Sequence, residues 1–248
     1  GEVMSLGQSI LEILLKAVRG LETGVDHFEM PKFKSWTKEQ LLEYIHTPTD
    51  ERLYALGEAI RKGATNEEIN KETAIVIPFI QIIRDAIDYE KVIAENVKNP
   101  DVLLKAKDMG FSDSYIGRVW GMSKTDMFKF RKEHNILPIY RIVDNVEHQQ
   151  DYVPYFYSCY HGENESIRTD KKKILVLGSG PIRIGQGVEF DYSTVHAVWA
   201  IKEAGYEAII INNNPETVST DYTTADKLYF EPLTVEDVMN VIDFEKPD

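Results

Sequence analysis

The sequence predicts a mixed fold class, α + α/β: an all-helical domain followed by a truncated parallel α/β subdomain. Two observations carry this prediction. Helix signals recur from Thr37 to about Asn135 with little strand character, whereas from Lys173 onward short apolar strands alternate with helices. Strands that alternate with helices are typical of a parallel sheet. Residues 151–172 are aromatic at first and then polar, and we interpret them as a linker between the two parts.

Composition excludes several classes of protein. The 248 residues are 43% hydrophobic and 28% charged, an ordinary balance for a globular protein. The net charge of −13 disfavours binding to nucleic-acid phosphates. No window approaches 18 uninterrupted apolar residues, and no signal peptide opens the chain, so we expect no membrane contact. A single cysteine, Cys159, can form neither an internal disulfide nor a multi-cysteine metal site, which favours a reducing, cytoplasmic location.

The first helix is predicted over Ser9 to Leu21, where apolar residues recur at spacings of three and four. Both ends of the sequence resemble cuts. No methionine opens the chain, and the last helix pattern, from about Val235, stops where an alternating fold requires a further strand. We therefore expect this sequence to be a piece of a larger protein.

Two capping boxes, TKEQ (37–40) and TNEE (65–68), predict helix starts in the middle part. Pro78 suits the first turn of a longer helix that reaches about Val97. The expected buried face of that helix is formed by Phe79, Ile82, Ile83, Ala86 and Ile87. Three shorter helices should follow over residues 101–109, 114–120 and 124–134.

A glycine loop, GSGPIRIGQG (178–187), joins an apolar strand at 174–177 to a helix near 193–204. A glycine turn before a helix presents backbone N–H groups to an anion, although it can also serve close packing alone. A dinucleotide fingerprint would need a glycine in place of Arg183 and an acid in place of the asparagines at 212–214. A nucleotide-dependent dehydrogenase fragment is therefore the disfavoured alternative, and the P-loop pattern is absent too.

The second strand, 208–211, ends in another polar loop, NNNPETVSTDY (212–222). Loops at the carboxyl ends of parallel strands are where open α/β sheets bind ligands, although asparagines also suit plain turns. Because both loops end strands of one sheet, we expect them to face the same crevice. A strand near 228–230 and the helix from Val235 complete the predicted elements.

The two loops carry a family resemblance. GSGPIRIGQGVEFDYSTVHA (178–197) and NNNPETVSTDYTTADKLYFEPLTVEDV (212–238) resemble the carbamoyl-phosphate synthetase large chain, in the pre-ATP-grasp subdomain of its second, carbamoyl-phosphate-forming half. GEVMSLG (1–7) resembles the end of the first, carboxyphosphate-forming half. The resemblance implies the tail of the first half in 1–24, a helical oligomerisation domain in 25–150, a linker in 151–172 and a partial Rossmann-like pre-ATP-grasp subdomain in 173–248.

The family is a ligase that makes carbamoyl phosphate from bicarbonate, ammonia and two ATP. A glutaminase small subunit supplies the ammonia from glutamine. Carbamate formed in one half travels through an internal tunnel to the other half, which shields this short-lived intermediate from water. The resemblance also implies homo-oligomer contacts through the helical domain and a role in arginine or pyrimidine synthesis.

The cofactors that the resemblance implies are ATP with Mg²⁺ or Mn²⁺ and, as a further ion, K⁺. They belong to ATP-grasp parts outside these residues, so we expect the piece to contain no catalytic residue and to be inactive alone. Its contribution would be subunit contacts and part of the tunnel wall. A non-catalytic assembly module is the alternative reading of the helical part.

Three site residues are carried over on the glycine loop: Arg183, Gln186 and Gly187. In the family this loop faces the carbamate-phosphorylating site and the tunnel exit. Gly187 matches a glycine of the tunnel wall, where a side chain would narrow the bore. Arg183 could hold a phosphate or carbamate oxygen, or it could pair with Glu189 or Asp191.

Three acids are also carried over: Glu2 in GEVM, Glu189 in EFDY and Glu216 in NPET match acids along the tunnel. Carboxylates beside one passage can exchange protons with carbamate, or repel one another enough to raise a pKa. A salt-bridged or helix-capping glutamate is the alternative for each of them.

The sequence departs from the family at two places. Gly7-Gln8-Ser9 stands where an arginine is common, and Pro78-Phe79 stands where the family often has a tryptophan-phenylalanine pair. A helix-turn-helix pattern over 103–135 carries a local charge of only 7 − 4 = +3, so DNA binding is disfavoured. The six histidines lack metal-ligand spacing. His196, on the helix after the glycine loop, could line the site, but we expect it to be a packed helix residue.

Overall fold

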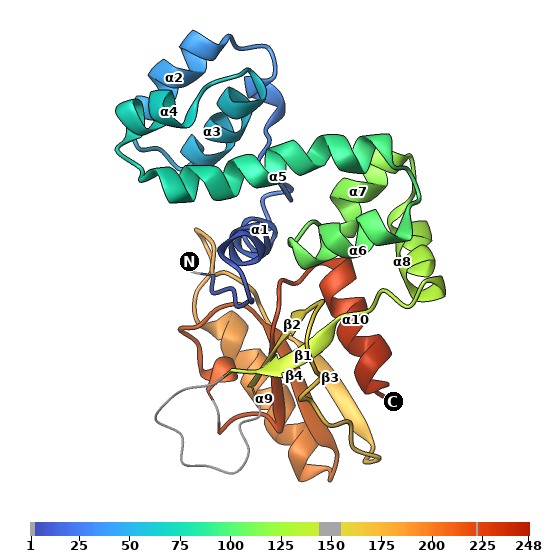
Figure 1. Cartoon of the computed structure of the whole chain (residues 1–248). Coiled ribbons are helices and arrows are strands. Elements are labelled where there is room, and N and C mark those ends of the chain that lie inside the picture. The colour runs from blue at the N-terminus through green and yellow to red at the C-terminus, as the bar shows by residue number, and fades with distance from the viewer. Residues whose placement is uncertain (1–2, 144–154, 222) are drawn as a thin grey trace. The chain divides into compact units, whose positions relative to one another are not determined.

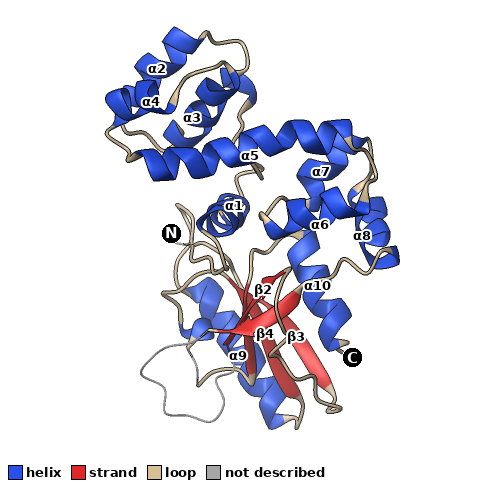
Figure 2. Cartoon of the chain, viewed as in Figure 1, coloured by secondary structure: helices blue, strands red, loops and turns tan. Residues whose placement is uncertain are grey.

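The structure, a computed structural model, describes residues 3–143, 155–221 and 223–248 (Figure 1). These residues form two compact units. The helical unit comprises Ser9–Val18 and Thr23–Phe130, and the α/β unit comprises Gly1–Gln8, Arg19–Glu22 and Arg131–Asp248. The α + α/β prediction is confirmed, since helices precede a five-stranded, mostly parallel sheet (Figure 2). Within the described residues, no helix has the length and apolarity needed to cross a membrane.

The predicted helix starts are confirmed by their caps. Thr37 and Thr65 each form a complete capping box, with Gln40 and Glu68 as the reciprocal partners. The helices of this part are α1 (Ile10–Gly20), α2 (Lys38–His46), α3 (Arg52–Arg61), α4 (Asn66–Thr73), α5 (Ile77–Glu95), α6 (Pro100–Asp108), α7 (Asp113–Trp120) and α8 (Lys124–Glu133), with a 3-10 turn, η1, at Pro31–Phe33. The helical core is built on the fully buried Phe28, Phe33, Leu41, Ile45, Leu56 and Ile69.

The long helix α5 begins as expected, with Pro78 in its first turn. Its buried side chains are Ile80, Ile83, Ala86, Ile87 and Ile93. The prediction was wrong for Phe79, which is 48% exposed, and Ile82 is only partly buried. Helical periodicity places Phe79 on the same side as Ile83 and Ala86, but it cannot tell how far the neighbouring helices extend along that side.

The sheet has the strand order β1-β2-β5-β4-β3. Its strands are β1 (Ile139–Ile142), β2 (Tyr155–Cys159), β3 (Lys173–Leu177), β4 (Glu207–Asn212) and β5 (Lys227–Phe230). β1 and β2 are antiparallel, and the other neighbours are parallel. The three strands predicted after residue 173 are confirmed to within one residue at each end.

The prediction of a linker over 151–172 is corrected, because β2 lies within that range. The buried Phe156 of β2 packs in one core cluster with Tyr140 of β1 and Tyr229 of β5. β1 likewise falls inside the range 25–150 that was expected to be helical. Both strands are short and exist through pairing with distant segments, so no local pattern marks them. Residues 151–154 of the linker lie outside the described residues.

Two helices cover the two faces of the sheet within the α/β unit. α10 (Val235–Glu245) packs on the face that presents Ile209 and Ile211, whereas α9 (Glu189–Glu203) packs on the face of Ala208 and Ile210. Successive residues of β4 thus serve opposite cores, as the alternation of side chains along a strand requires. The N-terminal Met4 and Leu6 join the α9 side of this core.

A buried ion pair fixes the segment Arg19–Glu22 within the same unit. The Arg19 guanidinium donates to both carboxylate oxygens of Asp237, at 3.0 and 3.1 Å. Burial disfavours the charged form of Arg19, but the carboxylate of Asp237 outweighs burial and raises its pKa. This pair brings the end of α1 to the start of α10, and thereby to the carboxyl ends of the strands.

Candidate functional site

The two polar loops meet at one edge of the sheet. The glycine loop follows β3 directly, and the asparagines follow β4, its parallel neighbour, with Leu177 opposite Ile211. The backbone N–H of Gly180 donates to the Asn212 side chain at 3.1 Å. The expectation that both loops face the same region is therefore confirmed.

The asparagines at 212–214 are buried and hold three segments together. Asn212 accepts hydrogen bonds from the backbone of Gly180 and donates to Ser219 at 3.2 Å. The side-chain amide of Asn213 donates to the backbone carbonyl of Gly20 at 3.0 Å, and the backbone carbonyl of Asn213 accepts from the N–H of Met4 at 2.7 Å. This role was not predicted from the sequence, although the side-chain amide of an asparagine can donate and accept hydrogen bonds, as that of Asn212 does here.

The glycines of the loop have different reasons to be glycine. A Cβ on Gly178 would collide with the buried side chain of Asn212. Gly180 and Gly185 have φ angles of +67° and +89°, in the left-handed region that favours glycine. Gly187 has no left-handed backbone, and the three atoms nearest to a Cβ at this position all belong to the carboxylate of Glu189, which is the flexible end of a side chain and can move aside.

Arg183 pairs with a carboxylate that the sequence did not suggest. Its guanidinium binds Glu22, while half of the Arg183 side chain stays exposed. The expected alternatives were wrong: Asp191 is buried and accepts a hydrogen bond from the N–H of Ser219 at 2.9 Å, and Glu189 lies over Gly187 instead. Because 161 residues separate Arg183 from Glu22 in the sequence, no local spacing could have indicated this pair.

Gln186 closes the tip of the same loop. Its side-chain oxygen accepts from the N–H of Arg183 at 3.1 Å, and its own N–H donates to the carbonyl of Arg183 at 2.9 Å. The two residues therefore form one small hydrogen-bonded turn, which keeps Arg183 in a fixed place relative to Gly187.

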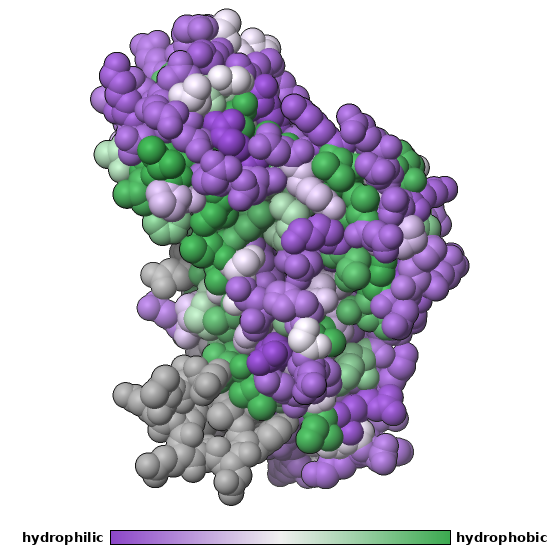
Figure 3. Space-filling model, in the orientation of Figure 1, coloured by the Kyte–Doolittle hydropathy of each residue, from purple (hydrophilic) through white to green (hydrophobic). Residues whose placement is uncertain are grey.

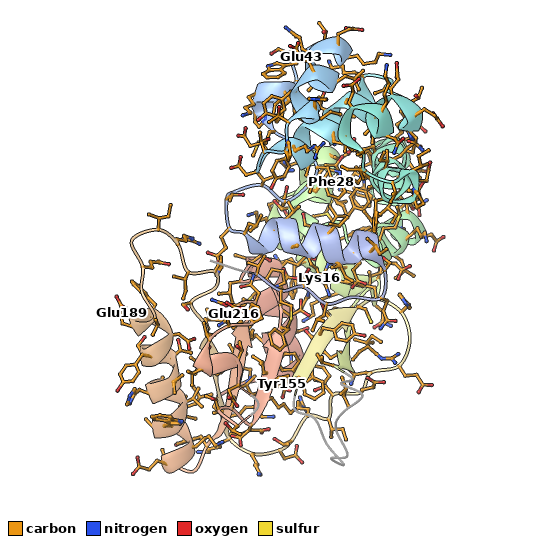
Figure 4. The ribbon with its side chains drawn as sticks, turned by 90° about the vertical axis from the view of Figure 1, so that its left-hand side faces the viewer. Lys16, Phe28, Glu43, Tyr155, Glu189 and Glu216 are labelled. Carbon is orange, nitrogen blue, oxygen red and sulfur yellow. The ribbon has the colours of Figure 1, made fainter. Side chains whose placement is uncertain are left out.

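Two of the predicted acids lie at this end of the α/β unit (Figure 4). Glu189 is exposed and begins α9, whereas Glu216 is exposed in the loop after β4, where its N–H donates to Asn214 at 3.0 Å. Glu2 lies outside the described residues. The structure thus brings Arg183, Gln186, Gly187, Glu189 and Glu216 to one edge of the sheet.

Acidic side chains mark the start of α9 beside the glycine loop. Glu189 and Asp191 occupy the first turn of α9, where their charges disfavour a phosphate. No group of three His, Cys, Asp or Glu side chains within the described ranges could hold a metal ion. A cavity of about 500 Å³ in the α/β unit contains none of the predicted site residues; it is lined by Leu6, Gly7, Arg141, Ile142, Val143, Tyr157 and Glu165.

The expectation of a packed His196 was wrong. The ring is exposed on α9, between Tyr192 and Trp199, with ring centroids 4.2 and 5.1 Å away. A helical period alone does not tell which side of a helix a sheet will cover, and α9 buries Thr194, Val195 and Val198 instead.

Comparison with known families accounts for most of the chain. Residues 2–135 match the model described as carbamoyl-phosphate synthetase large chain, oligomerisation domain, and residues 170–248 match the carbamoyl phosphate synthase preATP-grasp domain. The chain belongs to the carbamoyl-phosphate synthetase large-chain family. The family's preATP-grasp match includes both polar loops and every predicted site residue except Glu2, which falls within the oligomerisation match.

Membership in the carbamoyl-phosphate synthetase family makes the two domains parts of a ligase. It confirms the resemblance that the sequence carried in its two loops. The matched ranges begin and end differently from the predicted domains, and the assignment of residues 1–24 to the first synthetase half stays a prediction.

Proposed function

We propose that this chain serves the large subunit of a carbamoyl-phosphate synthetase that uses bicarbonate, ammonia and two ATP. A glutaminase small subunit would supply the ammonia from glutamine. The support is that both matched domains come from that large chain. Within it, the helical unit contributes contacts between large subunits, and the α/β unit contributes part of the wall of the carbamate passage.

The main support for a role in the wall of the carbamate passage comes from Gly187. The other loop glycines have a left-handed backbone or a buried close neighbour, whereas the nearest obstacle to a Cβ on Gly187 is a carboxylate that can move aside. We therefore infer that the missing side chain leaves open space beside the loop. An intermediate that decomposes in water needs an unobstructed, enclosed path of this kind.

Arg183 and the acids of the site would act on carbamate as it passes. The pairing with Glu22 holds the Arg183 guanidinium in place while half of its surface stays open to an anion. Glu2, Glu189 and Glu216 would repel the anion from the wall or exchange protons with it. The Arg183 guanidinium, held in place among these acids, would favour the passage of carbamate over its tight binding.

ATP, with Mg²⁺ or Mn²⁺ and K⁺, would bind in other parts of the large chain. The acidic first turn of α9 supports this division of labour. We place the enzyme in the cytoplasm, in arginine or pyrimidine synthesis.

The experiment that tests this function compares two proteins. The complete large subunit that contains this sequence is assayed for carbamoyl phosphate with ATP, bicarbonate and ammonia, and again with glutamine and the small subunit. The chain of 248 residues is assayed alone under the same conditions. We expect product from the complete protein and none from the chain, and product from the chain, or none from the complete protein, would contradict the proposal.

A further inference from the structure

A short segment from far upstream in the sequence lies beside the candidate site. It consists of residues 19–22, and it belongs to the α/β unit. We call these four residues the strap. The first of them, Arg19, donates to both carboxylate oxygens of Asp237 in the first turn of α10. One end of the strap is therefore fixed to the α/β unit by a buried ion pair.

The middle of the strap is anchored by Asn213. The side-chain amide of Asn213 donates to the backbone carbonyl of Gly20 at 3.0 Å, and a Cβ on Gly20 would come within 2.6 Å of the amide nitrogen. The absent side chain of Gly20 thus lets the amide reach the backbone. Asn213 is itself held in place, because its N–H donates to the Asn212 side chain at 3.0 Å and its carbonyl accepts from the N–H of Met4 at 2.7 Å.

The burial of Asn213 is costly. The residue is 1% exposed, and its side-chain oxygen has no hydrogen-bond partner among the described residues. Polar side chains lie mainly at the surface, as Figure 3 shows for one face of the molecule, because a buried polar atom without a partner costs free energy. The hydrogen bond to Gly20 is the gain that accompanies this cost.

The far end of the strap lies against the glycine loop. The carboxylate of Glu22 binds the Arg183 guanidinium, and a Cβ on Gly180 would come within 2.7 Å of one of its oxygens. Glu22 has φ +55°, in the left-handed region that favours glycine. Its side chain is 25% exposed, whereas that of Arg183 is 50% exposed. The strap thus presents a largely buried carboxylate to a guanidinium that is open on one side.

We propose that Asn213 is a positioning residue, which acts through the strap to set the place of the Arg183 guanidinium beside the passage. Asn213 fixes Gly20, and two residues later Glu22 holds Arg183. Without the anchor at Gly20, the carboxylate has more freedom, and the guanidinium that it holds is less well placed for an anion. This inference rests on the role proposed above for Arg183 and adds the residues that orient it.

The test uses the complete large subunit that contains this sequence, and it measures the ATP hydrolysed in the presence of bicarbonate per carbamoyl phosphate formed. The variants are Asn213→Ala, Arg183→Ala and the combination of both. Asn240→Ala is the matched control, because Asn240 is also a buried asparagine of the α/β unit, but it lies on α10 and accepts from Arg131 at 3.1 Å. Thermal unfolding checks that each variant folds.

Glu22→Gly provides a second route to the same test, alone and combined with Arg183→Ala. It removes the carboxylate of the strap, and the φ of +55° suits glycine, so the backbone is not strained by the change. It decides the outcome if Asn213→Ala does not fold.

We expect Asn213→Ala and Glu22→Gly each to raise the ratio by about two- to tenfold, the size of effect that follows from losing one hydrogen-bonded contact. Neither should have a further effect when Arg183 is already alanine, because no guanidinium is left to position. The control should keep the wild-type ratio.

Two results would overturn the positioning role and leave the proposed function intact. One is a folded variant of the strap or its anchor that keeps the wild-type ratio while Arg183→Ala raises it. The other is an effect that adds fully to that of Arg183→Ala, or that the control shows as well, since general loosening of the fold would explain it. If Arg183→Ala itself left the ratio unchanged, the role proposed for Arg183 would fail, and this inference with it.

Discussion

Within the glycine loop, some glycines are required by the packing of the fold, whereas Gly187 is not. Gly178 leaves room for Asn212, whose side chain is buried and bonded to both loops. At Gly187 the atoms nearest to a Cβ belong to the end of a flexible side chain, that of Glu189. The two glycines lie nine positions apart on one loop and so form a natural pair for comparison.

Gly178→Ala should destabilise the protein by about 1–3 kcal/mol, because the new Cβ displaces a buried, hydrogen-bonded amide. Gly187→Ala should change the free energy of unfolding by less than about 0.5 kcal/mol, because the Glu189 carboxylate can move aside. Urea unfolding of the two variants beside the wild type measures both values. Equal destabilisation by the two substitutions would contradict this assignment of roles.

At this scale the sequence predicted which residues gather at the site, but not how they are held. The order of strand, loop and helix was enough to bring Arg183, Gln186, Gly187, Glu189 and Glu216 to one edge. The Glu22 partner of Arg183 depends on the return of a distant segment. No spacing rule within the loop contains that information.

Among the elements, α3 and α5 are joined by a half-buried charge network. Arg61 donates to both carboxylate oxygens of Glu90, at 3.0 and 2.6 Å, and the His27 ring contacts Glu90 at 2.8 Å. Burial disfavours the ionised form of Glu90, but the hydrogen bonds from His27 and Arg61 outweigh it and lower its pKa below the usual range.

This network predicts a pH dependence of stability. Because the pKa of Glu90 is lower in the folded state, the unfolded chain binds more protons below the ordinary glutamate pKa of about 4.3. The stabilisation is complete above that pH and is lost as the pH falls through the folded-state pKa. Glu90→Gln should cost about 2–3 kcal/mol at neutral pH and should flatten the acid limb of the stability curve.

Thermal unfolding of Glu90→Gln between neutral and acidic pH measures the effect. The exposed Glu95 on the same helix provides the control, Glu95→Gln, which should follow the wild type. If Glu90→Gln kept the wild-type stability at neutral pH, the network would not join these helices energetically.

Some helices and strands could be predicted from the sequence, and others could not. Helix caps are local, so Thr37 and Thr65 marked their helices correctly. β1 and β2 depend on pairing with each other and with β5, and they were missed. Phe79 was misplaced for a related reason, since its exposure depends on where neighbouring helices end.

At the scale of the whole molecule, the chain contains two domains of the family. The oligomerisation range contains the helices α1 to α8, and the preATP-grasp range contains the polar loops. The long motifs of the two loops predicted the family, and the matches to both domains confirm it. We predict that the chain is inactive alone, because the parts proposed to bind ATP lie outside it.

The central claim is that the space beside Gly187 carries carbamate. The most direct test is a series at this position in the complete enzyme, with Gly, Ala, Val and Leu, and with Ala204→Leu as the control at the far end of α9. The measured quantity is the ATP hydrolysed in the presence of bicarbonate per carbamoyl phosphate formed. We expect this ratio to rise with side-chain volume, because carbamate forms but fails to arrive, while the control keeps the wild-type ratio. A ratio that stays constant across the series, whether both activities fall together or neither changes, would contradict the account.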